Sequence, residues 1–407
     1  MPAEVIVFLV AFAIRAAWVA GEDGAAIRES DDARAYQDLA INLAEHHQYV
    51  TAVDPPFRLD VPYAKRPPLT PMLLAATYSI FGSRPMAGQL VLACLSSLAV
   101  AVLYRVGGSL FGPPVAVIAA IVAAGYPFFV FLSAIPLTEN VAILLYTLLA
   151  AVLIKSREGF RLRDAALTGL VVGFAALNRP QILGLIPFLS LLVLGTDYTW
   201  RVRLQWLGLA IGVALLVLIP WTIRNRMVMG GWFPVSLQGG GVLYQGNNPY
   251  TQTAIDKLRA GAKGWYNDPQ YGAGLTGQGP VEEDRRALRL AVDFMRSHPG
   301  KTIGYSLQKI GIFFSAYQHP VAKLPWYPIF ALSLLGFLWT RRQWRRLLPI
   351  YVLIFQTILT AAIYTSMPRF RAPVEPFFLL MAAFGGYRLW QIIVGERPTH
   401  QAHQQES

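Results

Sequence analysis

Residues 4–20 read EVIVFLVAFAIRAAWVA, an apolar stretch with one internal charge, Arg15. Such stretches recur along the 407 residues, of which 55% are hydrophobic and only 14% charged. Several reach or approach the roughly 20 residues that a helix needs to cross the hydrocarbon core of a bilayer. Because backbone in lipid must satisfy its own hydrogen bonds, we predict an all-α, polytopic membrane protein.

The first stretch lacks the basic residues that precede the apolar region of a cleavable signal, so we expect a retained first span. The net charge of +12 then reports loop orientation, and no basic soluble module favours a nucleic-acid partner. The single cysteine, Cys94, allows no internal disulfide. The ten expected spans are residues 4–20, 88–104, 114–133, 138–154, 165–178, 181–196, 205–221, 326–340, 347–365 and 376–394.

Basic turns fix the orientation of these spans. The turns at 155–163 (KSREGFRLR), 201–203 (RVR) and 341–346 (RRQWRR) should all be cytoplasmic by the positive-inside rule. The apolar residues 69–81 would cover only about 20 Å at ~1.5 Å per residue, and as a span they would turn these basic loops outward. We therefore expect 69–81, and by the same argument 302–317, to be helices on the outer interface.

This topology places both termini in the cytoplasm and two large loops on the outer face. Polar residues that are not basic then gather outside, which predicts a site on the outer face of the cytoplasmic membrane. The expected organisation is a transmembrane core at 1–221 with a first outer loop at 21–87, a second outer loop with interfacial helices at 222–325, further spans at 326–394, and a cytoplasmic tail at 395–407.

Paired carboxylates follow the first span, in the stretch ESDDARAY at 29–36. Apolar residues recur at helical spacing over 33–46, which predicts an amphipathic helix. Ser30, Asp31 and Asp32 suit the N-cap and first turn of that helix, where acidic groups complement its dipole. Capping needs one side chain only, so we expect at least one aspartate to have a functional role.

Cations stand near other outer turns. Lys65 and Arg66 precede two prolines that restrict the backbone, and they either anchor the loop to lipid head groups or meet a phosphate. Glu139 and Arg179 lie in turns so short that they stay close to the hydrocarbon. An acid together with several arginines suits an anionic lipid head group.

The second outer loop carries GGGVLYQGNNP at 239–249. We expect a glycine-rich loop there, either plain or forming a wall that hydrogen-bonds a sugar, because no helix start follows at phosphate-binding distance. Residues 281–297 should form an amphipathic helix that ends before Pro299. The stretch PRFRAP at 368–373 adds two arginines before the last span, although arginines at span ends can also snorkel to water.

The order and membrane side of these motifs resemble those of membrane glycosyltransferases with the GT-C fold, in family 39 (the protein O-mannosyltransferases) and the related aminoarabinose transferases. Lys65 departs from the latter, because it stands where they have an acid, and this puts their metal site and acceptor in doubt. The stretches that carry the resemblance are DARAY at 32–36, RPPL at 66–69, TE at 138–139, PWTIRN at 220–225, GNNP at 246–249 and RFRAP at 369–373.

The resemblance implies transfer of a hexose or pentose from a polyprenyl-phosphate donor to a glycan, lipid or protein acceptor. Asp32 would be the general base that a hydroxyl acceptor needs, with Asp31 and Glu139 as further acidic residues. We expect no required cofactor and leave a divalent metal open. The expected phosphate-binding cations are Lys65, Arg66, Arg179, Arg369 and Arg371. The expected substrate contacts are Tyr36, Asn178, Asn225, Tyr244, Asn247 and Asn248.

Two other functions compete with this one. A transporter or flippase for a lipid-linked sugar would need the same anionic site, without a base but with access from both membrane faces. The one-sided large loops and the lack of a visible internal repeat argue against such alternating access. A purely structural membrane scaffold would leave the paired aspartates, Glu139 and the arginine turns unexplained.

Overall fold

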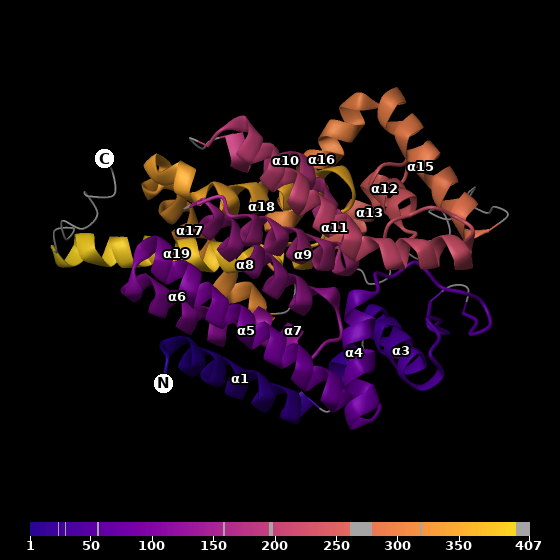
Figure 1. Ribbon diagram of the computed structural model, residues 1–407, viewed down its shortest axis with the longest axis horizontal. Coiled ribbons are helices and arrows are strands. Elements are labelled where there is room, and N and C mark those ends of the chain that lie inside the picture. The colour runs from indigo at the N-terminus through magenta and orange to yellow at the C-terminus, as the bar shows by residue number, and fades with distance from the viewer. Residues whose placement is uncertain are drawn as a thin grey trace.

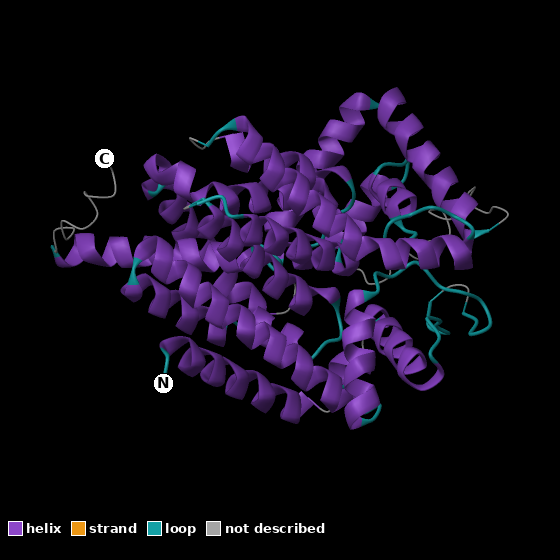
Figure 2. Cartoon of the chain, viewed as in Figure 1, coloured by secondary structure: helices purple, strands orange, loops and turns teal. Residues whose placement is uncertain are grey.

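The computed structural model describes residues 1–22, 24–28, 30–54, 57–157, 159–194, 198–260, 279–317 and 320–395. In these residues the regular structure is helical, apart from one isolated bridge between Thr51 and Arg58 (Figure 2). Long helices run along the long axis of the molecule, and the helices of the two large loops gather toward one end of it (Figure 1). The prediction of an all-α, multi-pass membrane protein is confirmed.

The helices of the first half are α1 (Ala3–Glu22), α2 (Ala25–Arg28), α3 (Asp31–His46), α4 (Leu69–Phe81), α5 (Pro85–Phe111), α6 (Pro113–Gly125), α7 (Pro127–Ser133), α8 (Thr138–Ser156), α9 (Leu162–Asn178), η1 (Pro180–Leu185) and α10 (Ile186–Leu194). Those of the second half are α11 (Trp200–Met229), α12 (Gly239–Gly246), α13 (Thr251–Arg259), α15 (Pro280–Ser297), α16 (Pro299–Phe314), α17 (Pro320–Trp339), η3 (Arg341–Gln343), α18 (Trp344–Ile363), η4 (Pro368–Arg371) and α19 (Glu375–Val394).

The described residues of all ten expected spans fall mainly on helices, but fewer of these helices are long and apolar enough to cross a membrane unaided. Residues 195–196 of the expected span 181–196, and the expected tail beyond residue 395, lie outside the described residues. In the described part of the chain, six qualify: α1, α5, α8, α11, η3 with α18, and α19. A seventh is added if α6 and α7, which meet at a bend of 53°, form one span. The expected spans at α9, η1–α10 and α17 are not among them.

The two expected interfacial helices are present as helices. Residues 69–81 form α4 over those same residues. The helix expected at 302–317 overlaps α16, which begins earlier, at Pro299, and ends earlier, at Phe314. The helix expected at 281–297 is α15. That α4 and α16 lie on the outer membrane surface stays a prediction.

The expectation of a glycine-rich loop at 239–249 is wrong, because residues Gly239–Gly246 form helix α12. Its glycines meet close neighbours: a Cβ on Gly240 would lie 1.9 Å from the carbonyl oxygen of Asp284 in α15. A Cβ on Gly246 would lie 1.6 Å from the carbonyl oxygen of Tyr364. Helix packing therefore accounts for glycine at these two positions.

The break between α6 and α7 is held by an arginine from the first span. Arg15 is fully buried, and its guanidinium donates to the carbonyl oxygens of Ala123 (3.2 Å) and Ala124 (3.0 Å) at the end of α6. It also donates to the hydroxyl of Ser96 in α5, at 3.0 Å. Carbonyls freed at a helix break need such donors inside a membrane protein. The one charge inside the first span thus supports the bend between α6 and α7, which precedes the turn that carries Glu139.

Candidate functional site

Charged side chains from distant parts of the chain converge beside the N-terminus of α3. Arg66 Nη1 lies 3.0 Å from Asp32 Oδ1, and Arg369 of η4 bonds the other oxygen of the same carboxylate. Glu139, at the N-terminus of α8, has one oxygen 3.5 Å from Arg179 Nη1 and 3.9 Å from Arg369 Nε. Together with Asp54, described below, these residues form what we call the charge cluster.

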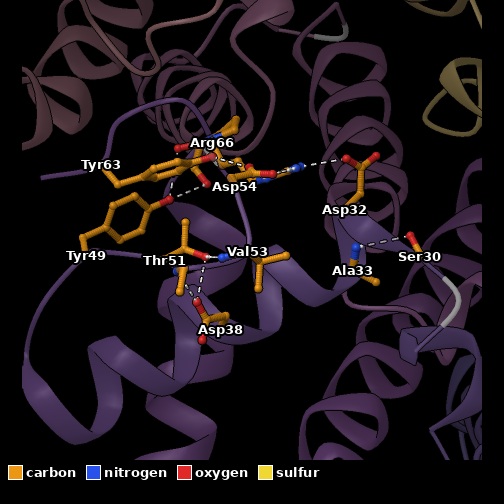
Figure 3. Close-up of polar contacts among 12 residues, drawn as sticks. Ser30, Asp32, Ala33, Asp38, Tyr49, Thr51, Val53, Asp54, Tyr63 and Arg66 are labelled. Atoms are coloured by element: carbon orange, nitrogen blue, oxygen red, sulfur yellow. Dashed lines mark hydrogen bonds and ion pairs between the residues drawn. The ribbon is translucent and has the colours of Figure 1, made fainter. Parts of the chain in front are cut away.

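The two adjacent aspartates of α3 have different surroundings. Ser30 caps the helix, because its hydroxyl accepts a hydrogen bond from the backbone N–H of Ala33 at 3.2 Å. Asp31 pairs with Arg34 in solvent, with 58% of its side chain exposed. Asp32, 27% exposed, turns toward Arg66 (Figure 3). The cap is therefore supplied without Asp32, whose carboxylate is left for the cluster.

Asp54 joins the cluster although no sequence motif singled it out. Its carboxylate accepts hydrogen bonds from Arg66 Nε (2.6 Å) and Nη2 (3.0 Å), and from the Tyr63 hydroxyl at 2.5 Å (Figure 3). The aspartate lies twelve residues before its arginine in an irregular segment. Neither helical nor strand periodicity links the two, so no sequence signal pointed to this pair.

The segment that carries Arg66 is tied to its surroundings. The Tyr49 hydroxyl donates to the carbonyl oxygens of Arg66 (3.0 Å) and Pro67 (3.2 Å). Arg224 of α11 donates to the carbonyl oxygen of Tyr63 at 2.9 Å and lies 5.5 Å from the ring centroid of Tyr49. Arg224 lies near the end of an expected span, where an arginine can simply extend to water. In the structure it instead connects the first loop to α11.

Aromatic rings support the three arginines of the cluster. The Arg66 guanidinium lies 5.0 Å from the ring centroid of Tyr36, and Arg179 and Arg369 lie 5.4 and 5.7 Å from that of Phe370. Such cation–π contacts stabilise a charge that is largely removed from water. Tyr36, an expected substrate contact, is buried under Arg66 in this structure.

Ion pairing within the cluster shifts the pKa of Asp32 and of Arg66. Burial would raise the pKa of the Asp32 carboxyl, but Arg369 and Arg66 outweigh this effect and hold that pKa well below its usual range. Burial opposes the charge of Arg66, yet Asp32 and Asp54 keep its pKa above the ordinary value. Three arginines thus face three carboxylates in the described structure.

Two arginine nitrogens of the cluster have N–H groups that donate no hydrogen bond in the described structure. Within the described residues, Arg179 Nη1 and Arg369 Nε are buried and have no hydrogen-bond acceptor. Both point toward Glu139 at ion-pair distance rather than hydrogen-bond distance. Buried charged donors of this kind gain most from an additional anionic oxygen.

Several expected site residues lie outside the cluster. Arg371 donates to the carbonyl oxygen of Ser315 at 2.9 Å, and its Nη2 lies 3.5 Å from Glu375 Oε1. Its Cζ lies 3.4 Å from the ring centroid of Trp326. These contacts make Arg371 part of the packing between η4 and its neighbours. Lys65 is half-buried beside Arg66.

The expected asparagine contacts hold backbone in place. Asn178 donates to the carbonyl oxygen of Thr138 (2.8 Å) beside Glu139, and Asn225 donates to that of Val235 (3.0 Å). Asn247 bonds the carbonyl oxygen of Ile363 (2.7 Å), Asn248 bonds that of Tyr244 (2.6 Å), and the Tyr244 side chain packs between α12 and α15. The structure brings Asn178 next to the cluster and keeps the other asparagines apart from it.

The carboxylates do not form a metal-ligand set. In the residues that the structure describes, no three His, Cys, Asp or Glu side chains come together as the ligands of a metal ion would. Asp32, Asp54 and Glu139 each face guanidinium groups instead. In the described structure these carboxylates therefore form ion pairs with arginines rather than facing one another.

Comparison with known proteins gives one family match and several similar structures. Residues 65–223 match the family described as dolichyl-phosphate-mannose-protein mannosyltransferase, a range that includes Arg66, Glu139 and Arg179. No curated protein sequence matches the chain significantly.

The similar structures include the apo oligosaccharyltransferase of Archaeoglobus fulgidus, with a TM-score of 0.58 and 13% identity over 97% of this chain and 52% of that one. The same organism's AglB in complex with an inhibitory peptide and a dolichol-phosphate has a TM-score of 0.55 and 12% identity, with the same coverage. ArnT from Cupriavidus metallidurans bound to undecaprenyl phosphate overlaps less, with a TM-score of 0.42 and 15% identity over 94% of this chain and 77% of that one.

These likenesses define the class: the chain is a multi-pass membrane protein with the GT-C fold. It spans about half the length of the oligosaccharyltransferase structures that it resembles (52%). Within that class, residues 65–223 are similar to the dolichyl-phosphate-mannose-protein mannosyltransferases, and the expected family resemblance is confirmed over that range.

Proposed function

We propose that the protein transfers a sugar from a polyprenyl-phosphate donor to an acceptor at the outer face of the cytoplasmic membrane. The observation that carries this proposal is the convergence of Arg66, Arg179 and Arg369 beside Asp32 and Glu139. The matched family residues 65–223 support it, because they include two of these arginines and the glutamate.

The arginines of the cluster would bind the donor phosphate. Arg179 Nη1 and Arg369 Nε have unused donor capacity, and Arg66 turns Nη1 toward the same region. In the transfer, the bond between the anomeric carbon and the phosphate oxygen breaks, and the electron pair leaves with the lipid phosphate. Preorganised guanidinium groups stabilise the negative charge that develops there.

Asp32 would be the general base. The acceptor's hydroxyl oxygen attacks the anomeric carbon, and its proton passes to the carboxylate of Asp32. A donor phosphate that shares Arg66 and Arg369 would weaken their hold on Asp32, and this would raise its basicity at the moment it is needed. Glu139 would orient Arg179 and Arg369, and exposed Asp31 would have a supporting role.

The test of the base compares Asp32→Asn with Asp31→Asn in purified protein supplied with several polyprenyl-phosphate sugars and candidate acceptors. We expect Asp32→Asn to lower product formation, measured by mass spectrometry, by about 10²–10⁴-fold, as for other general bases. Its binding of undecaprenyl phosphate should persist, and Asp31→Asn should lower product formation much less than Asp32→Asn does. An active Asp32→Asn with an inactive Asp31→Asn would reverse the assignment.

The same assay in detergent distinguishes a transferase from a flippase, because no membrane then separates two compartments. Arg179→Gln should weaken donor binding by about 2–5 kcal/mol and also lower turnover at saturating donor. Arg34→Gln, which removes an exposed arginine paired with Asp31, is the matched control and should change neither. Intact donor binding with no glycosidic product and no donor hydrolysis would favour the flippase.

A further inference from the structure

Asp54 occupies one complete edge of the Arg66 guanidinium. It accepts hydrogen bonds from Nε at 2.6 Å and from Nη2 at 3.0 Å, which is the bidentate geometry of a strong arginine–carboxylate pair. The remaining terminal nitrogen, Nη1, then points to Asp32 at 3.0 Å. Figure 3 shows the guanidinium between the two carboxylates, with Asp54 on the side of the loop and Asp32 on the side of α3.

The pair is enclosed and its geometry is fixed from both sides. The side chains of Arg66 and Asp54 are only 12% and 16% exposed. Asp54 receives a third hydrogen bond from Tyr63, which is itself buried, and Tyr49 holds the backbone of Arg66. Because the main chain of Arg66 is anchored, the position of Asp54 decides which nitrogen of the guanidinium faces Asp32.

We infer that Asp54 is a positioning residue for the donor phosphate, acting through Arg66. By holding the Nε–Nη2 edge, it presents Nη1 to the phosphate that would bind between Arg66, Arg179 and Arg369. This inference rests on the proposed function. The inference also predicts the direction in which neutralising Asp54 changes phosphate affinity. If Asp54 acted only as a negative charge, it would repel the phosphate, and its neutralisation would strengthen binding. If Asp54 positions Arg66, its neutralisation weakens binding.

This direction can be tested by measuring the affinity of the purified protein in nanodiscs for undecaprenyl phosphate. We expect Asp54→Asn to weaken binding by at least about tenfold, the effect of losing hydrogen bonds to a charged group, and to lower turnover at saturating donor. Asp54→Glu should restore part of both. Asp60→Asn is the matched control, because Asp60 pairs with Arg58 on the same loop in solvent, and it should change neither. Equal or tighter binding by Asp54→Asn would overturn the inference.

A second readout does not depend on the proposed function. Phenylglyoxal labelling, followed by peptide mass spectrometry, reports how firmly each arginine is held. Asp54→Asn should increase labelling of Arg66 several-fold, and Tyr63→Phe should do so to a smaller extent. Labelling of Arg224, which bonds the carbonyl oxygen of Tyr63, should stay unchanged.

The labelling outcomes also separate the two possible failures. Unchanged labelling of Arg66, or an equal rise at Arg66 and Arg224, would overturn the inference, since the aspartate would then not orient the arginine or would only hold the loop together. A wild type that binds no undecaprenyl or dolichol phosphate would contradict the proposed function, and Arg66 labelling would still decide whether Asp54 fixes the arginine.

Discussion

Asp31 and Asp32 illustrate how much one position along a helix changes a carboxylate. Successive residues of an α-helix point about 100° apart, so the neighbours cannot share one environment. Asp31 faces solvent and Arg34, whereas Asp32 faces two arginines that come from 34 and 337 residues further along the chain. The sequence pattern indicated a functional carboxylate here, and the structure distinguishes which of the two meets the arginines.

The pairing of Asp32 with Arg369 predicts a particular pH dependence. Because the pKa of Asp32 lies below its unfolded value of about 3.9, the ion pairs stabilise the fold above roughly pH 4 and lose this effect as the pH falls through the folded pKa. Sugar transfer should therefore show no acid limb from Asp32 between about pH 5 and 8. Arg369→Gln should raise that pKa and shift the acid limb upward.

The check is kcat/KM for transfer measured from pH 4 to 8 in both proteins, with Arg34→Gln as a control that leaves Asp32 and its partners intact. Superimposable profiles for the wild type and Arg369→Gln would contradict the coupling between the two residues.

Most of the charge cluster follows from local sequence, and one member does not. Each of five members stands in a short motif near the end of an expected helix, and the structure brings all five together: Asp32, Arg66, Glu139, Arg179 and Arg369. Their catalytic and binding roles stay predictions. Asp54 joins only because the chain between α3 and α4 folds back on itself, which no spacing rule describes.

At the scale of elements, helices with periodic apolar residues and caps were predictable, but packing decides the others. Helices α3 and α4 formed where expected, with Ser30 as the N-cap of α3. The three glycines that begin α12 favour a loop by intrinsic propensity. Contacts with α15 and Tyr364 override that preference, and such contacts cannot be read from the local sequence.

The crossing of α9 and α11 gives a prediction about packing. A Cβ on Gly169 would lie 2.4 Å from the carbonyl oxygen of Ala210, so the two backbones are in contact. Gly169→Ala should destabilise the protein by about 1–3 kcal/mol, the usual effect of overpacking. Gly212 of α11 has no neighbour within 4 Å of such an atom, so Gly212→Ala should be neutral or stabilising by up to about 1 kcal/mol.

Thermal unfolding of the two variants in detergent, read by intrinsic tryptophan fluorescence, measures the difference. If Gly169→Ala were at least as stable as Gly212→Ala, the prediction would be wrong, because α9 and α11 could then separate at this crossing without loss of stability.

At the scale of the whole molecule, the expected topology puts the two large loops outside. In a Cys94→Ala background, a cysteine at Leu59, which is 48% exposed on the first loop, should react with an impermeant thiol reagent added to intact cells. A cysteine at Leu162, which is 58% exposed within the basic turn at 155–163, should be protected until the cells are opened. Labelling at position 162 but not at 59 would contradict the predicted topology, and with it the prediction of a site on the outer face.

The balance of three arginines against three carboxylates also bears on how the protein would complete a turnover. The sugar-linked donor is a phosphate diester with one negative charge, whereas the released polyprenyl phosphate is a monoester with nearly two at neutral pH. In the proposed reaction, the arginines would therefore attract the released polyprenyl phosphate more strongly than the sugar-linked donor. Release of this product, rather than bond breaking, is then expected to limit the rate, and added polyprenyl phosphate should inhibit in competition with the donor.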